Sequence, residues 1–318
     1  MIVSVSRRTD VPALYSDWFF HRLHEGFALV RNPMNPHQVS RVALDSEHAD
    51  AFVFWSKNPA PMLPRLHELG GRPYVFQFTL TPYGTDIEGA LPDKRALLRT
   101  FAQLADALGP ERVIWRYDPI LFTPRYDEAF HLRAFEAMVK RLYPHTRRVT
   151  VSFIDPYRHI QRAVRELDIQ FPDAQRQLAL LGPLAACARS YGLAIDTCCE
   201  AGDFSALGVT HAHCIDAQLL GAIAGLPAAA SHDAHQRENC GCAASVDIGV
   251  YDTCTHSCRY CYATHNLRAA QRYDEHSPLL CSSLLPGDVI RDRAMPAAFD
   301  RQISLCEGGL PCHEGKPL

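Results

Sequence analysis

The stretch VDIGVYDTCTHSCRYCYATHN, residues 246–266, decides how this chain is interpreted. Its apolar start, Val246–Tyr251, predicts a buried β-strand because it is short and rich in β-branched residues. Cys254, Cys258 and Cys261 follow at once, so three thiols share one short loop. Thiolates are soft ligands that select iron–sulfur clusters or zinc. A [4Fe–4S] cluster held by these three cysteines keeps one iron open for another ligand. Zinc sites favour paired C-x2-C units that are further apart, which this spacing fits poorly.

The rest of the composition narrows the setting of this loop. The chain has 318 residues, is 47% hydrophobic and carries a formal net charge of −3. That charge gives no strong field for nucleic acid or an anionic membrane, and no apolar run is long enough to span a bilayer. The twelve cysteines all lie from Cys187 onward. Because the N-terminus lacks a signal-peptide pattern, we expect a cytoplasmic protein whose cysteines serve metal or redox chemistry rather than disulfides.

Short apolar runs alternate with amphipathic segments along most of the chain. This alternation predicts an α/β fold with parallel strands, forming a full or partial (β/α) barrel. The predicted strands are Ile2–Ser6, Ala51–Trp55, Tyr74–Leu80, Val113–Tyr117, Val149–Ile154, Leu193–Thr197 and Val246–Tyr251. The predicted helices are Asp17–Glu25, Asp93–Leu108, Tyr126–Leu142 and Asp173–Tyr191.

The cysteine loop resembles the signature of the radical S-adenosylmethionine superfamily. CTHSCRYC fits the pattern C-x3-C-x-aromatic-C, with Tyr260 at the aromatic position. The resemblance implies that Cys254, Cys258 and Cys261 bind a [4Fe–4S] cluster and that S-adenosylmethionine binds its open iron. It also implies that Tyr260 packs near the adenine. The expected activity is generation of a 5′-deoxyadenosyl radical, with electrons from a donor such as flavodoxin or ferredoxin.

The position of this signature departs from the superfamily, where it follows the first barrel strand. A circular permutation explains the difference, with Val246–Tyr251 as first strand and Ile2–Ser6 as second. IVSVSRRTDVP, residues 2–12, and FVFWSKNPAPMLPRL, residues 52–66, resemble segments of spore photoproduct lyase-like enzymes. The complete pattern resembles an uncharacterised bacterial family described as a domain of unknown function. The Gly-Gly-Glu segment that usually binds the amino group of the cofactor is missing.

Polar residues after the predicted strands are the other candidates for cofactor binding. The carboxyl ends of parallel strands share one rim, where the active sites of barrels lie. Carboxylates or a lysine there can hold the ribose or the amino acid part of the cofactor, and an arginine can hold its carboxylate. The candidates are Asp10, Lys57, Arg116, Asp118 and Asp155. A charged residue after a strand also commonly starts a loop or caps a helix, so each residue alone keeps that second interpretation.

A second group of cysteines precedes the signature. Cys198 or Cys199, together with Cys214, Cys240 and Cys242, can complete a four-thiolate site for another iron–sulfur cluster or for zinc. The alternative is that they are buried small hydrophobes or incidental thiols. We interpret the remaining cysteines the same way, including Cys306 and Cys312.

The domain organisation follows from these assignments. Residues 1–200 are expected to supply barrel strands and helices, and residues 201–245 a connector or subdomain containing Cys and His. Residues 246–270 are expected to complete the barrel with the cluster loop, and residues 271–318, rich in Pro, Gly and Arg, to form a C-terminal tail. RNPMNPHQVSR, residues 31–41, is expected to be a polar loop at a substrate mouth.

Two other functions stay open beside a radical enzyme with an unknown substrate. One is a non-catalytic iron–sulfur or zinc protein for electron transfer or structure. The other is a nucleic-acid lesion lyase or modifying enzyme, suggested by the lyase-like N-terminal half and disfavoured by the acidic net charge. The sequence does not name a substrate.

Overall fold

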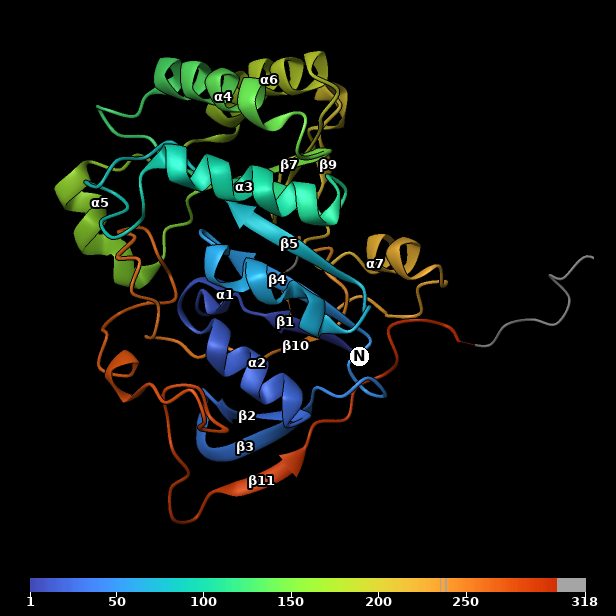
Figure 1. Ribbon diagram of the computed structural model, residues 1–318. Coiled ribbons are helices and arrows are strands. Elements are labelled where there is room, and N and C mark those ends of the chain that lie inside the picture. Colours follow the sequence, from blue (N-terminus) through green and yellow to red (C-terminus); the bar gives the residue numbers. More distant parts are fainter. Residues whose placement is uncertain (235, 238, 302–318) are drawn as a thin grey trace, which may run out of the picture.

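A single parallel sheet organises the chain. The computed structural model describes residues 1–234, 236–237 and 239–301, and it has an α/β fold (Figure 1). Eight parallel strands lie in the order β10-β1-β4-β5-β6-β7-β8-β9. They are β10 (Ser245–Asp247), β1 (Ile2–Val5), β4 (Ala51–Ser56), β5 (Tyr74–Thr79), β6 (Val113–Ile120), β7 (Arg148–Phe153), β8 (Ala194–Thr197) and β9 (Thr210–His211).

A second, three-stranded sheet and a set of helices complete the fold. The small sheet has the order β11 (Val289–Asp292), β3 (Asn35–Ala43) and β2 (Phe27–Asn32). The helices are α1 (Val11–Leu14), α2 (Ser16–His24), α3 (Lys94–Leu108), α4 (Glu128–Leu142), α5 (Gln161–Leu167), α6 (Ala174–Ser190) and α7 (Ala217–Ala224). Short 3₁₀ helices cover Ala60–Leu69, Arg158–Ile160, Ser205–Leu207 and Ala270–Arg272.

The two faces of the large sheet are packed differently. Side chains such as Phe54 and Phe76 join the main hydrophobic core with α2, α3, α4 and α6. The alternate residues of the same strands, such as Val53 and Val75, join a smaller core with α7. Figure 1 shows α3, α4 and α6 on the helical side and α7 on the other side. Because side chains alternate along a strand, the second face is free to become polar toward the carboxyl ends of the strands, where the cavity described below lies.

The predicted α/β alternation is confirmed, and the predicted strands up to Leu193–Thr197 and the four predicted helices agree with the structure within a few residues. The strand predicted for Val246–Tyr251 is shorter, because β10 ends at Asp247. The Asp247 carboxylate accepts hydrogen bonds from Ser6 Oγ at 2.5 Å and from Gly249 N at 3.0 Å, which turns the chain. Gly249 then passes so close to Ser6 that an added Cβ would lie 2.1 Å from its Oγ.

The sheet has two edge strands, β9 and β10. The pairings among the described residues do not join these edges to each other. What the structure shows is therefore a large parallel sheet, with β10 beside β1 in the register Ile2 with Ser245 and Ser4 with Asp247. The expected connector, residues 201–245, contributes β9 and α7 to this architecture. In the described part of the chain, every helix is too short or too polar to cross a membrane.

Two predicted irregular segments have regular structure instead. Residues 31–41 belong largely to the antiparallel pair β2 and β3, away from the large sheet, so they do not form a loop at its carboxyl edge. The prediction failed because β3 is exposed at Asn35–His37 and because prolines lie in the turn, at Pro33, and near the start of β3, at Pro36.

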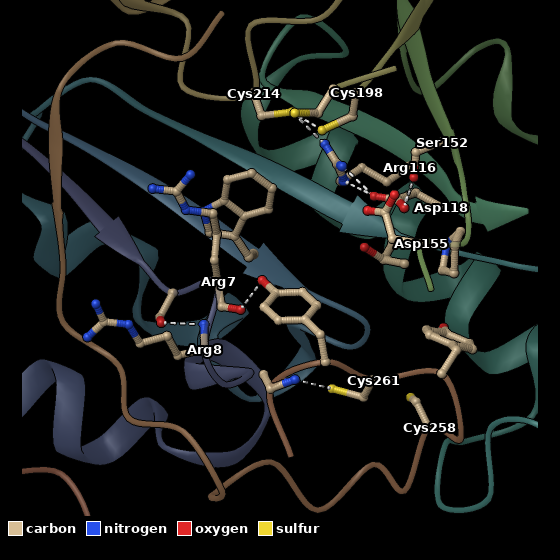
Figure 2. A pocket seen from close by; sticks show the side chains of 18 of the residues that line it. Arg7, Arg8, Arg116, Asp118, Ser152, Asp155, Cys198, Cys214, Cys258 and Cys261 are labelled. Atoms are coloured by element: carbon tan, nitrogen blue, oxygen red, sulfur yellow. Dashed lines mark hydrogen bonds and ion pairs between the residues drawn. The ribbon is translucent and has the colours of Figure 1, made fainter. Parts of the chain in front are cut away.

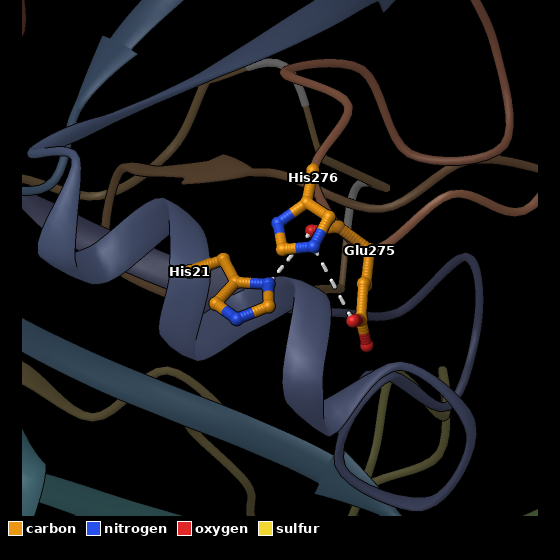
Figure 3. Close-up of side chains that lie close together, drawn as sticks. All are labelled: His21, Glu275 and His276. Carbon is orange, nitrogen blue, oxygen red and sulfur yellow. Dashed lines mark hydrogen bonds and ion pairs between the residues drawn. The ribbon is translucent and has the colours of Figure 1, made fainter.

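The described part of the predicted tail is also anchored. β11 pairs in parallel with β3, and Leu279 and Phe299 are buried. The segment before it lies along α2, where His21 and His276 stack with ring centroids 4.5 Å apart beside Glu275 (Figure 3). Residues 302–318, with Cys306 and Cys312, lie outside the described residues.

Candidate functional site

A cavity of about 540 Å³ opens at the carboxyl edge of the large sheet. Its volume lies within the range of small-molecule and cofactor sites, roughly 300–1,000 Å³. Figure 2 shows Cys198 and Cys214 on one side of it and Cys258 and Cys261 on the other. The structure brings every candidate residue from the sequence to this cavity: Asp10, Lys57, Arg116, Asp118, Asp155, Tyr260, Cys254, Cys258, Cys261, Cys198, Cys214, Cys240 and Cys242.

Backbone hydrogen bonds hold the loop that carries the three clustered cysteines. The segment after β5 runs antiparallel to it, and Glu88 and Cys258 form a β-bridge. Arg259 N donates to Ile87 O at 2.9 Å, and Ala90 N donates to His256 O at 3.1 Å. Ala263 N donates to Cys261 Sγ at 3.4 Å. The loop is therefore fixed by the body of the protein, which sets the directions of its thiols.

Asp10 ties the same loop to two other elements. Its Oδ1 accepts from Ala13 N at 3.0 Å and caps α1, while its Oδ2 accepts from Lys57 N at 2.7 Å. His256 Nε2 also lies 2.8 Å from Oδ2. Burial raises the pKa of Asp10, but the bond and charge of His256 together with the hydrogen bonds from Lys57 N and Ser56 outweigh burial, and the net shift is downward. Both oxygens are occupied, so this carboxylate acts by positioning the cysteine loop.

Lys57 and Tyr260 meet at a carboxylate that sequence reasoning missed. Glu88 is only 2% exposed, and it accepts from Lys57 Nζ at 2.7 Å, from Lys94 Nζ at 2.5 Å and from the Tyr260 hydroxyl. Burial opposes its ionisation, but the two lysines lower the pKa of Glu88 to about 2. The lysine is thus engaged by a buried anion, and Tyr260 is held with its ring along the cavity wall.

Burial disfavours the thiolate form of two of the loop cysteines, Cys254 and Cys258. It raises the pKa of Cys258 to about 12 against the opposing effect of Lys57, and it raises the pKa of Cys254 as well. A thiolate in such a setting needs a cation beside it, and a bound metal centre supplies that cation. Among the described residues, three ligand atoms of His, Cys, Asp or Glu that all lie within 4.8 Å of one another occur only at His21, Glu275 and His276. The loop sulfurs are thus spread wider than the about 3.8 Å that separates thiolates around one zinc ion.

Polar side chains line the wall formed by β6 and β7. Arg116 Nε donates to Asp118 Oδ2 at 3.0 Å, and Ser152 Oγ donates to the other oxygen of Asp118. Further along, Tyr157 OH donates to Asp155 Oδ2 at 3.0 Å, and Arg237 pairs with the same carboxylate. Both predicted carboxylates are therefore paired with arginines, Asp118 with Arg116 of the same strand and Asp155 with Arg237 of a distant segment.

Two adjacent arginines lie on the opposite wall, after β1. Arg7 lies over the ring of Trp55 and Arg8 over the ring of Tyr251, at 5.8 and 5.3 Å from the ring centroids. Stacking of this kind uses the face of a guanidinium and leaves its N–H edge for other partners. An anionic group in the cavity therefore has donors available at this wall.

The second group of cysteines gathers on one wall of the cavity. Cys198 Sγ lies 3.2 Å from Cys214 Sγ. Cys240 and Cys242 line the same cavity. Arg116 Nη1 donates to Cys214 Sγ at 2.9 Å, and Ile215 N donates to Cys242 Sγ at 3.4 Å. Three separate segments of the chain thus contribute thiols to one place in the cavity wall.

Sequence reasoning missed the residues that position the site: Glu88, His256, Arg237 and Asp247. His256 lies inside the cysteine signature, so the sequence indicates that it is near the thiols. The sequence does not indicate that its partner is Asp10. Asp247 starts the segment before the signature and accepts hydrogen bonds from Ser4, Ser6, Arg7 and Gly249. Glu88 carries no local signal, because it follows no strand directly and lies far from the other site residues in sequence.

Comparison with known proteins gives a family without a described activity. Residues 2–263 match the model of a family described as a domain of unknown function, DUF1848. No curated protein matches the chain significantly. The match spans both the N-terminal strands and the cysteine loop, so the cavity is built entirely from the family's own segment.

Proposed function

The chain belongs to the DUF1848 family, and on that premise we propose that it is a radical S-adenosylmethionine enzyme. One observation carries the proposal. Cys254, Cys258 and Cys261 come from one loop with the spacing C-x3-C-x2-C, and all three line a cavity of about 540 Å³. When bound there, a [4Fe–4S] cluster supplies the electron that cleaves S-adenosylmethionine into methionine and a 5′-deoxyadenosyl radical.

The residues present fit such a cluster in number and spacing. Three thiolates can each bind one iron of a four-iron cube, which leaves the fourth iron for another ligand. The three sulfurs are not gathered around one point, as a single zinc ion requires. A [4Fe–4S] cluster instead binds each thiolate at a different iron, so its cysteine sulfurs lie further apart than those around one zinc ion.

The order of strands supports a permuted barrel of the radical-enzyme type. The strand before the cysteine loop, β10, pairs in parallel with the N-terminal strand β1. Reading the sheet from β10 therefore gives the cluster strand first and the remaining strands in sequence order up to β9. This is the order expected if the first strand and its loop were moved to the end of the sequence.

The chain's own residues would bind and orient the cofactor. Tyr260 presents its ring to the cavity, with its hydroxyl donating to Glu88. Arg7 and Arg8 offer guanidinium edges to a carboxylate. Asp10 and Lys57 already have partners, so they fix the loop and Tyr260 in place. The substrate shares the same cavity, and we propose flavodoxin or ferredoxin as the electron donor.

Anaerobic reconstitution with iron and sulfide tests this proposal. The reduced protein should convert S-adenosylmethionine into 5′-deoxyadenosine and methionine, and its electron paramagnetic resonance spectrum should change when S-adenosylmethionine is added. Cys258→Ala should lose both properties. Cys187→Ala, a change in α6 outside the cavity, is the matched control and should keep both. A cluster indifferent to S-adenosylmethionine would instead favour a non-catalytic iron–sulfur protein.

A further inference from the structure

Five thiols that the proposed chemistry does not use also line the cavity, and Cys199 is one of them. Cys198 follows β8, Cys214 follows β9, and Cys240 and Cys242 precede β10. We propose that these four cysteines, the tetrad, bind a second iron–sulfur cluster that faces the first across the cavity. The inference goes beyond the proposed function and does not depend on S-adenosylmethionine binding at the other wall.

The fold brings the tetrad together through the large sheet and its connections. Ala212 N donates to Thr197 O at 2.7 Å, which places the segment of Cys214 beside that of Cys198. Ala243 N donates to Ile215 O at 2.9 Å, which adds the segment of Cys242. These backbone bonds fix three chain segments, so the gathering of sulfurs is a property of the framework.

The sulfurs of the tetrad lie on adjoining segments. Cys198 Sγ is 3.2 Å from Cys214 Sγ, and Ile215 N, next to Cys214, donates to Cys242 Sγ at 3.4 Å. Cys240 lines the same cavity two residues before Cys242. Four thiols brought to one cavity wall are not explained as buried hydrophobes, because such cysteines pack among apolar groups. Four thiolates around a metal centre, by contrast, are the common ligand set of iron–sulfur clusters.

Two arginines border the tetrad. The buried guanidinium of Arg116 donates to Cys214 Sγ at 2.9 Å and also pairs with Asp118. Arg7 lines the same cavity and is bonded to Gln236 at 3.2 Å. A charged donor makes a stronger hydrogen bond to an anionic acceptor than to a neutral one. Arg116 is therefore placed to stabilise a thiolate ligand at Cys214.

The arrangement favours a cluster with several irons over one zinc ion or a disulfide. Among the described residues no three of the tetrad sulfurs converge within 4.8 Å, although a zinc ion needs all four at about 3.8 Å from one another. Cys198 and Cys214 alone are close enough to form a disulfide after a small movement. A disulfide would, however, leave Cys240 and Cys242 without a role beside the arginines.

The decisive experiment removes the first site and asks whether iron stays. A variant with Cys254→Ala, Cys258→Ala and Cys261→Ala keeps the tetrad intact. After anaerobic reconstitution and gel filtration, we expect it to hold about two to four irons per chain with matching sulfide, seen as a cluster by Mössbauer spectroscopy. The unchanged chain should hold about four irons more.

The converse variant and a control complete the test. Cys214→Ala with Cys242→Ala should reduce the iron content to about four per chain, while Cys187→Ala should not change it. If the double variant does not fold by circular dichroism, the triple variant decides alone. An iron-free triple variant, a bound zinc ion, or a Cys198–Cys214 disulfide found by peptide mapping would overturn the proposal. Full iron content without any response to S-adenosylmethionine would overturn the proposed function and leave this one standing.

Discussion

Replacing Glu88 with glutamine removes the negative charge at the centre of the site and keeps the size of the side chain. The side chain is buried, and its carboxylate accepts hydrogen bonds from Lys57 Nζ at 2.7 Å, Thr81 Oγ1 at 2.7 Å and Lys94 Nζ at 2.5 Å. Glutamine has nearly the same volume, but it is neutral and brings two N–H donors. The variant therefore leaves two ammonium groups facing a neutral amide in a buried place.

The structure gives the size of the expected effect. The two lysines lower the pKa of Glu88 from 4.5 to about 2 against the effect of burial. At about 1.4 kcal/mol per pKa unit, this corresponds to roughly 3 kcal/mol in favour of the charged carboxylate. Breaking a buried ion pair on one side costs about 3–5 kcal/mol in measured cases. We assign the larger share to Lys57, whose pKa Glu88 raises despite burial, whereas burial lowers that of Lys94.

Urea unfolding followed by circular dichroism measures this loss. Glu88→Gln should reduce the free energy of unfolding by about 3 kcal/mol. Glu136→Gln is the matched control, because Glu136 pairs with Lys140 on the exposed surface of α4, and it should change stability by less than about 0.5 kcal/mol. If the two variants unfold at the same urea concentration, the buried network does not stabilise the fold as argued.

Three further perturbations follow from the same structure. Gly249→Ala should destabilise the protein by more than about 2 kcal/mol, because the new Cβ would lie 2.1 Å from Ser6 Oγ. The control Gly182→Ala should be tolerated, because the nearest atom to its new Cβ lies 3.8 Å away. Equal urea midpoints for the two variants would contradict this. Burial lowers the pKa of His131 below 6.5, so the unfolded chain binds the proton first and the free energy of unfolding falls as the pH drops below 6.5. His131→Gln should flatten that fall between about pH 7 and about pH 5, and parallel pH profiles of the two proteins would refute it. Asp10→Asn should keep the cap of α1 but weaken the bond to His256, so the reconstituted protein should lose iron faster to a chelator; unchanged loss would mean that Asp10 does not position the loop.

Much of the fold was predictable because its strands are short, buried and apolar. The apolar runs around Phe54 and Phe76 are typical of buried strands. Helix α3 follows a capping aspartate, Asp93, and ends before Gly109. The small sheet was missed because β3 is exposed over its first residues and its partner β11 is exposed throughout. Local patterns are weakest where a strand is stabilised by pairing rather than by burial.

The candidate site was also predicted only in part. The sequence indicated the thiols and the polar residues after strands, because parallel strands place their carboxyl ends at one edge. It did not indicate which residues these side chains pair with. From the sequence, Lys57 was expected to bind a ligand, but in the structure it forms an ion pair with Glu88. Asp155 was expected to do the same, but it forms an ion pair with Arg237. Sequence reasoning names the residue types at a rim, whereas the pairs formed across the cavity depend on distant segments.

The short strand β10 explains how two groups of thiols reach one cavity. It has three residues and spans about 10 Å, so the loops before and after it leave the sheet close to one another. The loop before it carries Cys240 and Cys242, and the loop after it carries Cys254, Cys258 and Cys261. Pairing with β1 holds this strand at the edge of the sheet. Gly249 permits the close approach of that second loop to Ser6, so the position of Cys254, Cys258 and Cys261 depends on the absence of a side chain at this residue.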